Sequence, residues 1–207
     1  LVMLGFTLFG WRIGYATGGG HFPGRCGHIV FLGLLVVAQG NQSVLADIHY
    51  VSTNGLNNAP YTNVTDAARV IQDAIDVASD GDTILVAAGV YKLGGRVVYG
   101  AVTNRIAITK GLKVQSSTGP SNTVIDAYAP PSIPPTATRC AYVGTNACLS
   151  GFTMVNGRTL ETGDVANEQS GGGVWCDVGS VISNCVVSSN RACRYAGGIY
   201  CAGSNIV

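Results

Sequence analysis

Three aromatic residues recur at matching points of a repeated sequence, and they are the side chains best suited to binding a ligand. Tyr142, Trp175 and Tyr200 are separated by 33 and 25 residues, and each stands between two small or apolar residues. Alternate side chains of a strand face opposite sides, so the three rings are predicted to share one outward face. Such rings can lie against sugars, because they combine an apolar face with a polar tip. The alternative is that the rings only stack on one another and stabilise the sheet.

Acidic residues offer a second kind of chemistry. Glu161, Asp164 and Glu168 lie in a polar segment between two copies of the repeat. Carboxylate oxygens are the ligands that Ca²⁺ prefers, so these three residues are candidate calcium ligands. The alternative is a solvated polar loop that binds no metal. Outside this segment the repeated region offers Asp126 and Asp177 as carboxylates, without a matching group of Arg or Lys, and we expect no catalytic residue in this chain.

The cysteines follow the repeat. Six of the seven come after residue 46, namely Cys140, Cys148, Cys176, Cys185, Cys193 and Cys201. An even number in a secreted chain permits disulfides. Cys176 and Cys201 would lie inside on neighbouring strands about 4.8 Å apart, within disulfide range. Because side chains of parallel strands in register point the same way, we favour a reduced stack and keep the disulfide as the alternative. Zinc is not expected, since Cys-x-x-Cys pairs are absent and His49 is the one histidine after residue 46.

The strands that must position these side chains are visible as a repeat. The segment Gly172 to Cys176 returns as Gly197 to Cys201, and Leu149 to Met154 aligns without a gap on Ile182 to Val187. A repeat of this length, with short apolar strands and Gly/Asn turns, is typical of a solenoid in which each unit buries its face on its neighbours. The earlier repeat carries a surplus of eight residues in the polar loop Arg158 to Ser170, where solenoids place insertions.

The composition favours the same architecture. The 207 residues include 29 glycines, and only 11% of the residues are charged. Many glycines and β-branched residues with little charge fit an all-β parallel solenoid with tight turns over residues 83–207. The alternative is a β-sandwich whose repeats are coincidental. The net charge is +1 and Lys and Arg form no run, which argues against nucleic acid or an anionic membrane surface as a partner.

Residues 1–46 are predicted to be a leader. Arg25 precedes the apolar run Ile29 to Ala38, which is shorter than the roughly 20 residues of a membrane-spanning helix. Val44, Leu45 and Ala46 supply small residues at the positions that signal peptidase reads, so cleavage is expected after Ala46. Residues 47–207 would then be the N-terminal part of one solenoid domain, truncated at its C-terminal end, and the mature chain would not span a membrane. The alternative is an N-terminal membrane anchor.

One segment before the repeats is predicted to be an amphipathic helix. It covers about residues 66–79, with Asn63 or Thr65 as the N-terminal cap and Gly81 at its end. Five small or apolar residues fall on one stripe of this helix: Ala67, Ile71, Ala74, Ile75 and Ala78. A helix at the N-terminal end of a solenoid can cover the apolar end of the first coil.

Two segments carry a resemblance to a known family. Val70 to Tyr91 resembles the N-terminal cap and first strands of secreted right-handed parallel β-helix proteins, the pectin-lyase-like superfamily, and Leu149 to Gly157 resembles their coil motif. The resemblance covers Ile48 to Val207 and implies a right-handed parallel β-helix. It is not specific for activity, since the superfamily includes polysaccharide lyases, glycoside hydrolases, phage tailspikes and adhesins. The Asn-Thr-Asp, Asp-Asp and His-Gly signatures of its pectin-degrading hydrolases are absent here.

Together these patterns predict a secreted or cell-surface β-helix protein that binds glycans or other surfaces without catalysis. A second hypothesis is the N-terminal part of a carbohydrate-active enzyme, a polysaccharide lyase or glycoside hydrolase, whose catalytic coils lie beyond Val207. A third is a structural stalk or passenger domain. Further coils with clustered acidic and basic residues would favour the enzyme, whereas a C-terminal anchor or sorting signal would favour the surface protein.

Overall fold

The computed structural model describes residues 45–128 and 137–203. These residues belong to one compact unit, Ser43–Val207. The predicted leader lies outside the described residues up to residue 44. Within the described residues, no helix is long and apolar enough to cross a bilayer.

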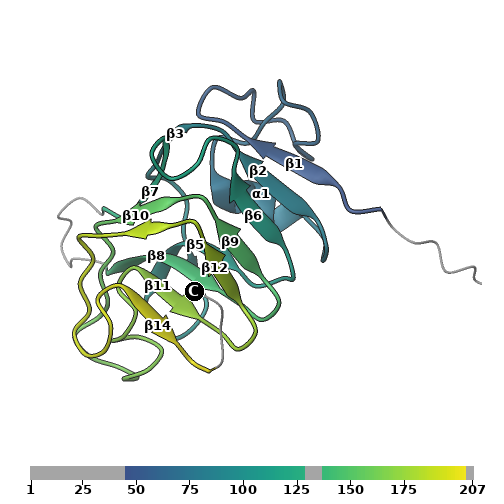
Figure 1. Cartoon of the computed structure of the whole chain (residues 1–207). Helices are drawn as coiled ribbons and strands as arrows, with labels where there is room; N and C mark the ends of the chain where they lie inside the picture. The colour runs from purple at the N-terminus through teal and green to yellow at the C-terminus, as the bar shows by residue number, and fades with distance from the viewer. Residues whose placement is uncertain (1–44, 129–136, 204–207) are drawn as a thin grey trace, which may run out of the picture. The chain divides into compact units, whose positions relative to one another are not determined.

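The described residues form a parallel β-solenoid of about four turns (Figure 1). Sheet A stacks β1 (Ile48–Val51), β2 (Thr83–Val86), β6 (Lys113–Ser116), β9 (Cys148–Ser150) and β12 (Val181–Ser183). Sheet B stacks β3 (Gly89–Tyr91), β7 (Thr123–Asp126), β10 (Thr153–Val155) and β13 (Val186–Val187). Sheet C stacks β4 (Arg96–Val97), β5 (Thr103–Ile108), β8 (Thr138–Val143), β11 (Val174–Cys176) and β14 (Ile199–Cys201). The predicted parallel solenoid is therefore confirmed.

The pairing of the strands confirms the repeat alignment residue by residue. Trp175 pairs with Tyr142 on one side and with Tyr200 on the other, and Ile182 pairs with Leu149. A slip of one residue would turn every apolar side chain to the wrong face, so the hydrophobic pattern specifies this register. Strand β4 was not predicted, and its pairing with β5 is antiparallel because the chain turns back directly into β5.

The interior of the solenoid holds columns of apolar side chains from the three sheets. Fully buried members from successive turns include Ile84, Val114, Leu149, Ile106, Val143, Cys176, Ile125 and Met154. Each coil covers the apolar face of its neighbours, which supplies the main stabilisation of a stack of short strands. The repeated Gly-Gly pair has a steric reason, because a Cβ on Gly173 would lie 2.7 Å from the carbonyl oxygen of Gly198 on the next turn.

The helix is shorter than predicted and is not the N-terminal element. Helix α1 spans Ile71–Val77, whereas the sequence pattern predicted residues 66–79, and β1 precedes it in the chain. The residue before the helix, Val70, is extended and makes no side-chain cap. The predicted first turn is instead used in other contacts, since Ala68 forms a bridge with Val51. Apolar residues of α1 join the core beside β1, β2 and β5.

Lys110 stabilises the end of α1. Its ammonium group donates to the carbonyl oxygens of Ile75, Asp76 and Ala78 at 3.1, 2.9 and 2.6 Å. The last carbonyl groups of a helix lack partners within the helix, and a cation there also compensates the helix dipole. The helix therefore ends before Gly81, with Ala78 already in an extended conformation.

Candidate functional site

The three predicted aromatic residues lie next to one another on the outer face of sheet C. The ring centroids of Tyr142 and Trp175 are 5.1 Å apart, with 13° between the ring planes, and those of Trp175 and Tyr200 are 6.3 Å apart. Their strand neighbours Val143 and Cys176 belong to the solenoid core, whereas these rings form a separate cluster. The predicted sharing of one face is confirmed by this register, and ligand binding by the rings stays a prediction.

The exposure expected for this column is corrected by the structure. Tyr142 and Trp175 are each only 4% exposed. The inserted loop covers Trp175, whose indole N–H donates to the carbonyl oxygen of Ala166 at 3.0 Å. From the other side, the ring centroid of Tyr99 lies 5.9 Å from those of both Tyr142 and Trp175. These two rings are therefore not an open platform.

Two rings at the edge of this group reach the solvent. Tyr99 is 40% exposed and Tyr200 is half-buried, and both pack against Trp175. We name Tyr99, Tyr142, Trp175 and Tyr200 the aromatic cluster. Tyr99 was missed because it lies between β4 and β5, outside the repeated segments. Its one sequence signal is the short apolar run Val97 to Tyr99 between two glycine-containing turns.

A buried arginine fastens the inserted loop to sheet C. Arg139 is 1% exposed, and its guanidinium donates to the carbonyl oxygens of Gly171, Asn167 and Ser170 at 2.7, 2.9 and 2.8 Å. A fourth hydrogen bond of 2.9 Å goes to the side-chain oxygen of Asn104. Burial lowers the pKa of Arg139 to about 10, so the group keeps its charge at neutral pH. A buried polar group is costly without partners, and here each guanidinium nitrogen has one.

The three predicted calcium ligands are not brought together, and two of them, Asp164 and Glu168, accept backbone N–H groups. The carboxylate of Glu168 accepts the N–H groups of Asp164 at 2.9 Å and Ala101 at 2.7 Å, and these bonds lower the pKa of Glu168. Gly100 permits this approach, because a Cβ there would collide with the Glu168 carboxylate. Glu161 lies apart, in the wall of a pocket. In the part of the chain that the structure describes, no three His, Cys, Asp or Glu side chains are grouped to hold a metal.

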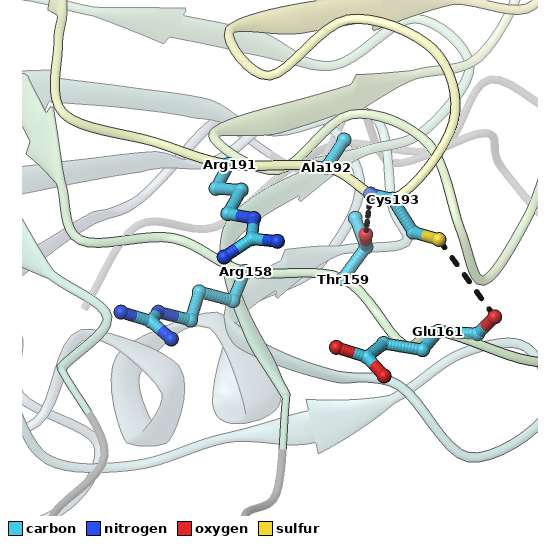
Figure 2. A pocket seen from close by; sticks show the side chains of 6 residues that line it. All are labelled: Arg158, Thr159, Glu161, Arg191, Ala192 and Cys193. Atoms are coloured by element: carbon cyan, nitrogen blue, oxygen red, sulfur yellow. Dashed lines mark hydrogen bonds between the residues drawn. The ribbon is translucent and has the colours of Figure 1, made fainter.

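The pocket lies at the start of the inserted loop (Figure 2). It has a volume of about 140 Å³ and is lined by Arg158, Thr159, Glu161, Arg191, Ala192 and Cys193. Arg158 and Arg191 form a parallel bridge between neighbouring turns. Both side chains are exposed, and in Figure 2 Arg191 extends toward the segment that carries Arg158. The sequence reading missed this pair, although the 33-residue offset that aligns Tyr142 with Trp175 also aligns the two arginines.

The six described cysteines are all free thiols, as the favoured reduced stack predicts. Cys176 and Cys201 are paired in register, with Cys176 buried and Cys201 exposed. Burial, and then the neighbouring Cys201 thiol, raise the pKa of Cys176 to about 12. Burial likewise raises the pKa of Cys140 to about 12. The thiolate is the reactive form, so these two side chains act as small apolar groups at neutral pH.

The two coil carboxylates serve separate structural contacts. Asp126 accepts from the side-chain amide of Asn156 at 2.9 Å and lies 3.2 Å from Lys92. Burial alone would raise the pKa of Asp126, but these contacts and the N–H of Tyr128 lower it. Asp177 follows β11 and accepts the hydroxyl of Tyr142 at 3.3 Å. The two acids therefore end strands of different sheets and are each engaged by neighbours.

Comparison with known proteins adds no assignment, since no protein-family model, curated protein or solved structure matches this chain. The solenoid fold is established by the strand pairing alone. The pectin-lyase-like resemblance rests on the sequence motifs, and the function must be argued from the site geometry.

Proposed function

We propose that this chain is the solenoid part of a secreted or cell-surface protein that binds glycans without changing them chemically. We further propose that the solenoid is a right-handed parallel β-helix of the pectin-lyase-like kind. The observation that carries the binding proposal is the aromatic cluster on the outer face of sheet C, with Tyr99 and Tyr200 partly exposed. Tyrosine rings at a protein surface offer an apolar face and a hydroxyl group, which suits the mixed surface of a sugar.

The buried members of the cluster position the exposed ones. Trp175 packs against both Tyr99 and Tyr200, and its indole N–H is held by Ala166. Tyr142 stacks on Trp175 and is tied to Asp177 through its hydroxyl. A ring held in this way loses little conformational freedom on binding, and such rigid aromatic side chains commonly dominate binding energy.

The acidic residues of the coils support binding more than hydrolysis. A glycoside hydrolase needs two carboxyl groups about 5–10 Å apart that face the same bond. Asp126 ends β7 in sheet B, whereas Asp177 follows β11 in sheet C. Each carboxylate is already engaged by neighbouring side chains. This arrangement fits a scaffold that presents a binding surface.

A glycan array with the full chain, followed by calorimetric titration of a hit, tests the proposal. Tyr99→Ala and Tyr200→Ala should each weaken binding about tenfold, because an aromatic contact of about 1.5 kcal/mol corresponds to that factor. Their melting temperatures should change little, since both rings are partly exposed. Tyr128→Ala is the matched control, because Tyr128 is 52% exposed and lies outside the cluster. The absence of any hit with folded protein would refute glycan binding.

A further inference from the structure

We infer that Arg158 and Arg191 form an anion-binding site that takes a carboxylate or sulfate group of an acidic glycan. The choice of a glycan as the bearer of the anion rests on the proposed function. The anion site itself rests on the pocket and its two arginines, which are separate from the aromatic cluster.

The two arginines stand on a rigid part of the solenoid. The backbone N–H of Arg158 donates to the carbonyl oxygen of Thr138 at 2.8 Å, and that of Arg191 donates to Gly157 at 2.8 Å. The side chain of Asn190 adds to this framework by accepting the N–H of Gly157 at 2.7 Å. Paired residues on neighbouring parallel strands lie about 4.8 Å apart. The fold therefore holds the two arginines at directly paired backbone positions, and both line the same pocket.

Their lack of protein partners distinguishes these two arginines from the other arginines that the structure describes. Five arginine side chains donate to protein oxygens: Arg69, Arg96, Arg105, Arg139 and Arg194. Within the described ranges 45–128 and 137–203, no such bond or ion pair is made by the side chain of Arg158 or Arg191. Like charges at directly paired strand positions repel each other, so an anion between them relieves an unfavourable contact.

The chemistry and size of the pocket select the ligand. A guanidinium group presents parallel N–H donors that match the oxygens of carboxylate and sulfate groups. The pocket, of about 140 Å³, is open to solvent on one side, so a charged group can enter it while the rest of a larger ligand stays outside. The neighbouring hydroxyl of Thr159 is already engaged, because it donates to Gln169 and accepts the N–H of Cys193. The arginines are thus the main donors.

Glu161 opposes the anion from the wall of the same pocket. Its side chain is exposed, and its backbone carbonyl oxygen lies 3.7 Å from the thiol of Cys193. In Figure 2 its carboxylate lies below Thr159, and the side chain of Arg158 extends away from it to the left. Removing this negative charge should therefore strengthen anion binding, which gives a test with the opposite sign.

The experiment titrates the full chain with three probes at constant ionic strength: sulfated disaccharide, glucuronate-containing disaccharide and the neutral parent disaccharide. Calorimetry should detect one or both acidic probes, and their comparison decides between sulfate and carboxylate. Arg158→Gln and Arg191→Gln should each weaken binding about tenfold, as expected for loss of charge-assisted hydrogen bonds. Glu161→Gln should tighten it a few-fold. Arg158→Lys keeps the positive charge but lacks the paired N–H donors of a guanidinium group. This variant should therefore bind the acidic probes less tightly than wild type while folding normally.

Arg194→Gln is the control with the same loss of charge, since Arg194 is exposed, lies near the pocket in sequence and bonds to Gln169. Equal weakening by this variant would show nonspecific attraction and overturn the site. Unchanged affinity in folded Arg158→Gln and Arg191→Gln proteins would overturn it as well. If the acidic probes bind equally well to Tyr99→Ala and Tyr200→Ala, the proposed role of the rings is refuted and the anion site stands. If binding is lost only in Tyr99→Ala and Tyr200→Ala and not in the arginine variants, the anion site is refuted and the role of the rings stands.

Discussion

Replacing Arg139 by methionine should release the inserted loop and destabilise the whole solenoid. Methionine is similar in length but cannot donate, so four acceptors lose their partner. Three of these belong to buried residues, namely Asn104, Ser170 and Gly171. Each buried acceptor left without a partner costs about 1–3 kcal/mol, and removing a buried charge recovers part of that cost. We therefore expect the free energy of unfolding to fall by about 3–5 kcal/mol.

The loop and the fold can be observed separately. Urea unfolding followed by circular dichroism gives the free energy, and acrylamide quenching of Trp175 fluorescence reports the loop, because Ala166 of that loop covers the indole. The chain has two tryptophans, so the measurement uses a Trp11→Phe background. Arg139→Lys should fall between wild type and Arg139→Met, since an ammonium group has fewer donors in a different geometry.

Arg96→Gln is the control for this prediction. Arg96 forms an ion pair with Asp76, but the two side chains are 48% and 39% exposed. Exposed ion pairs contribute about 0–1 kcal/mol, so this variant should unfold almost like wild type. A loss below about 1 kcal/mol for Arg139→Met, with Trp175 as well protected as before, would refute the assignment of Arg139 as the anchor of the loop.

Two further predictions concern titration and thiol reactivity. Burial alone would raise the pKa of Asp82, but hydrogen bonds from Ser79, Asp47 and His49 lower this pKa below its ordinary value. The ionised Asp82 therefore stabilises the fold above the unfolded pKa of about 4, and this stabilisation is lost as the pH falls below that value. The melting temperature should therefore drop from pH 5 to pH 3, and Asp82→Asn should reduce that drop; an equal drop in the variant would contradict this. In alkylation at pH 8 followed by mass spectrometry, the exposed thiols of Cys193 and Cys201 should react first. The buried thiols of Cys140 and Cys176 should react only when the protein unfolds, and early labelling of Cys140 would contradict its burial.

The repeat could be predicted from the sequence down to individual pairs. The pairing of Trp175 with Tyr142 and Tyr200 follows from alternation, because a shift of one residue would place the rings in the core. The insertion between two repeats was also visible, as the surplus of the longer repeat. Both follow from aligning one copy of the repeat on the next, so a register found in one copy is checked by the other.

The path of the inserted loop could not be predicted in the same way. Its anchors join residues far apart in the chain, as Arg139 does with Gly171 and Asn104 at separations of 32 and 35 residues. The local sequence of a polar loop does not indicate which buried donor elsewhere in the chain will bind its carbonyl oxygens. The helix was overestimated for a related reason, because Ala67 continues its apolar stripe but is buried in a non-helical segment, where its carbonyl oxygen accepts the N–H of Asn57.

The inserted loop covers one of the two equivalent aromatic rings, and the other lies on the last described strand, β14 (Ile199–Cys201). Trp175 and Tyr200 occupy equivalent strand positions, yet the connection from β10 to β11 carries the insertion, and the connection from β13 to β14 does not. Ala166 of the insertion covers Trp175, whereas Tyr200 is only half-buried. The same insertion begins at Arg158, which lines the pocket. One loop therefore covers part of the aromatic face and also contributes Arg158, Thr159 and Glu161 to the pocket, so a change in this loop should alter both.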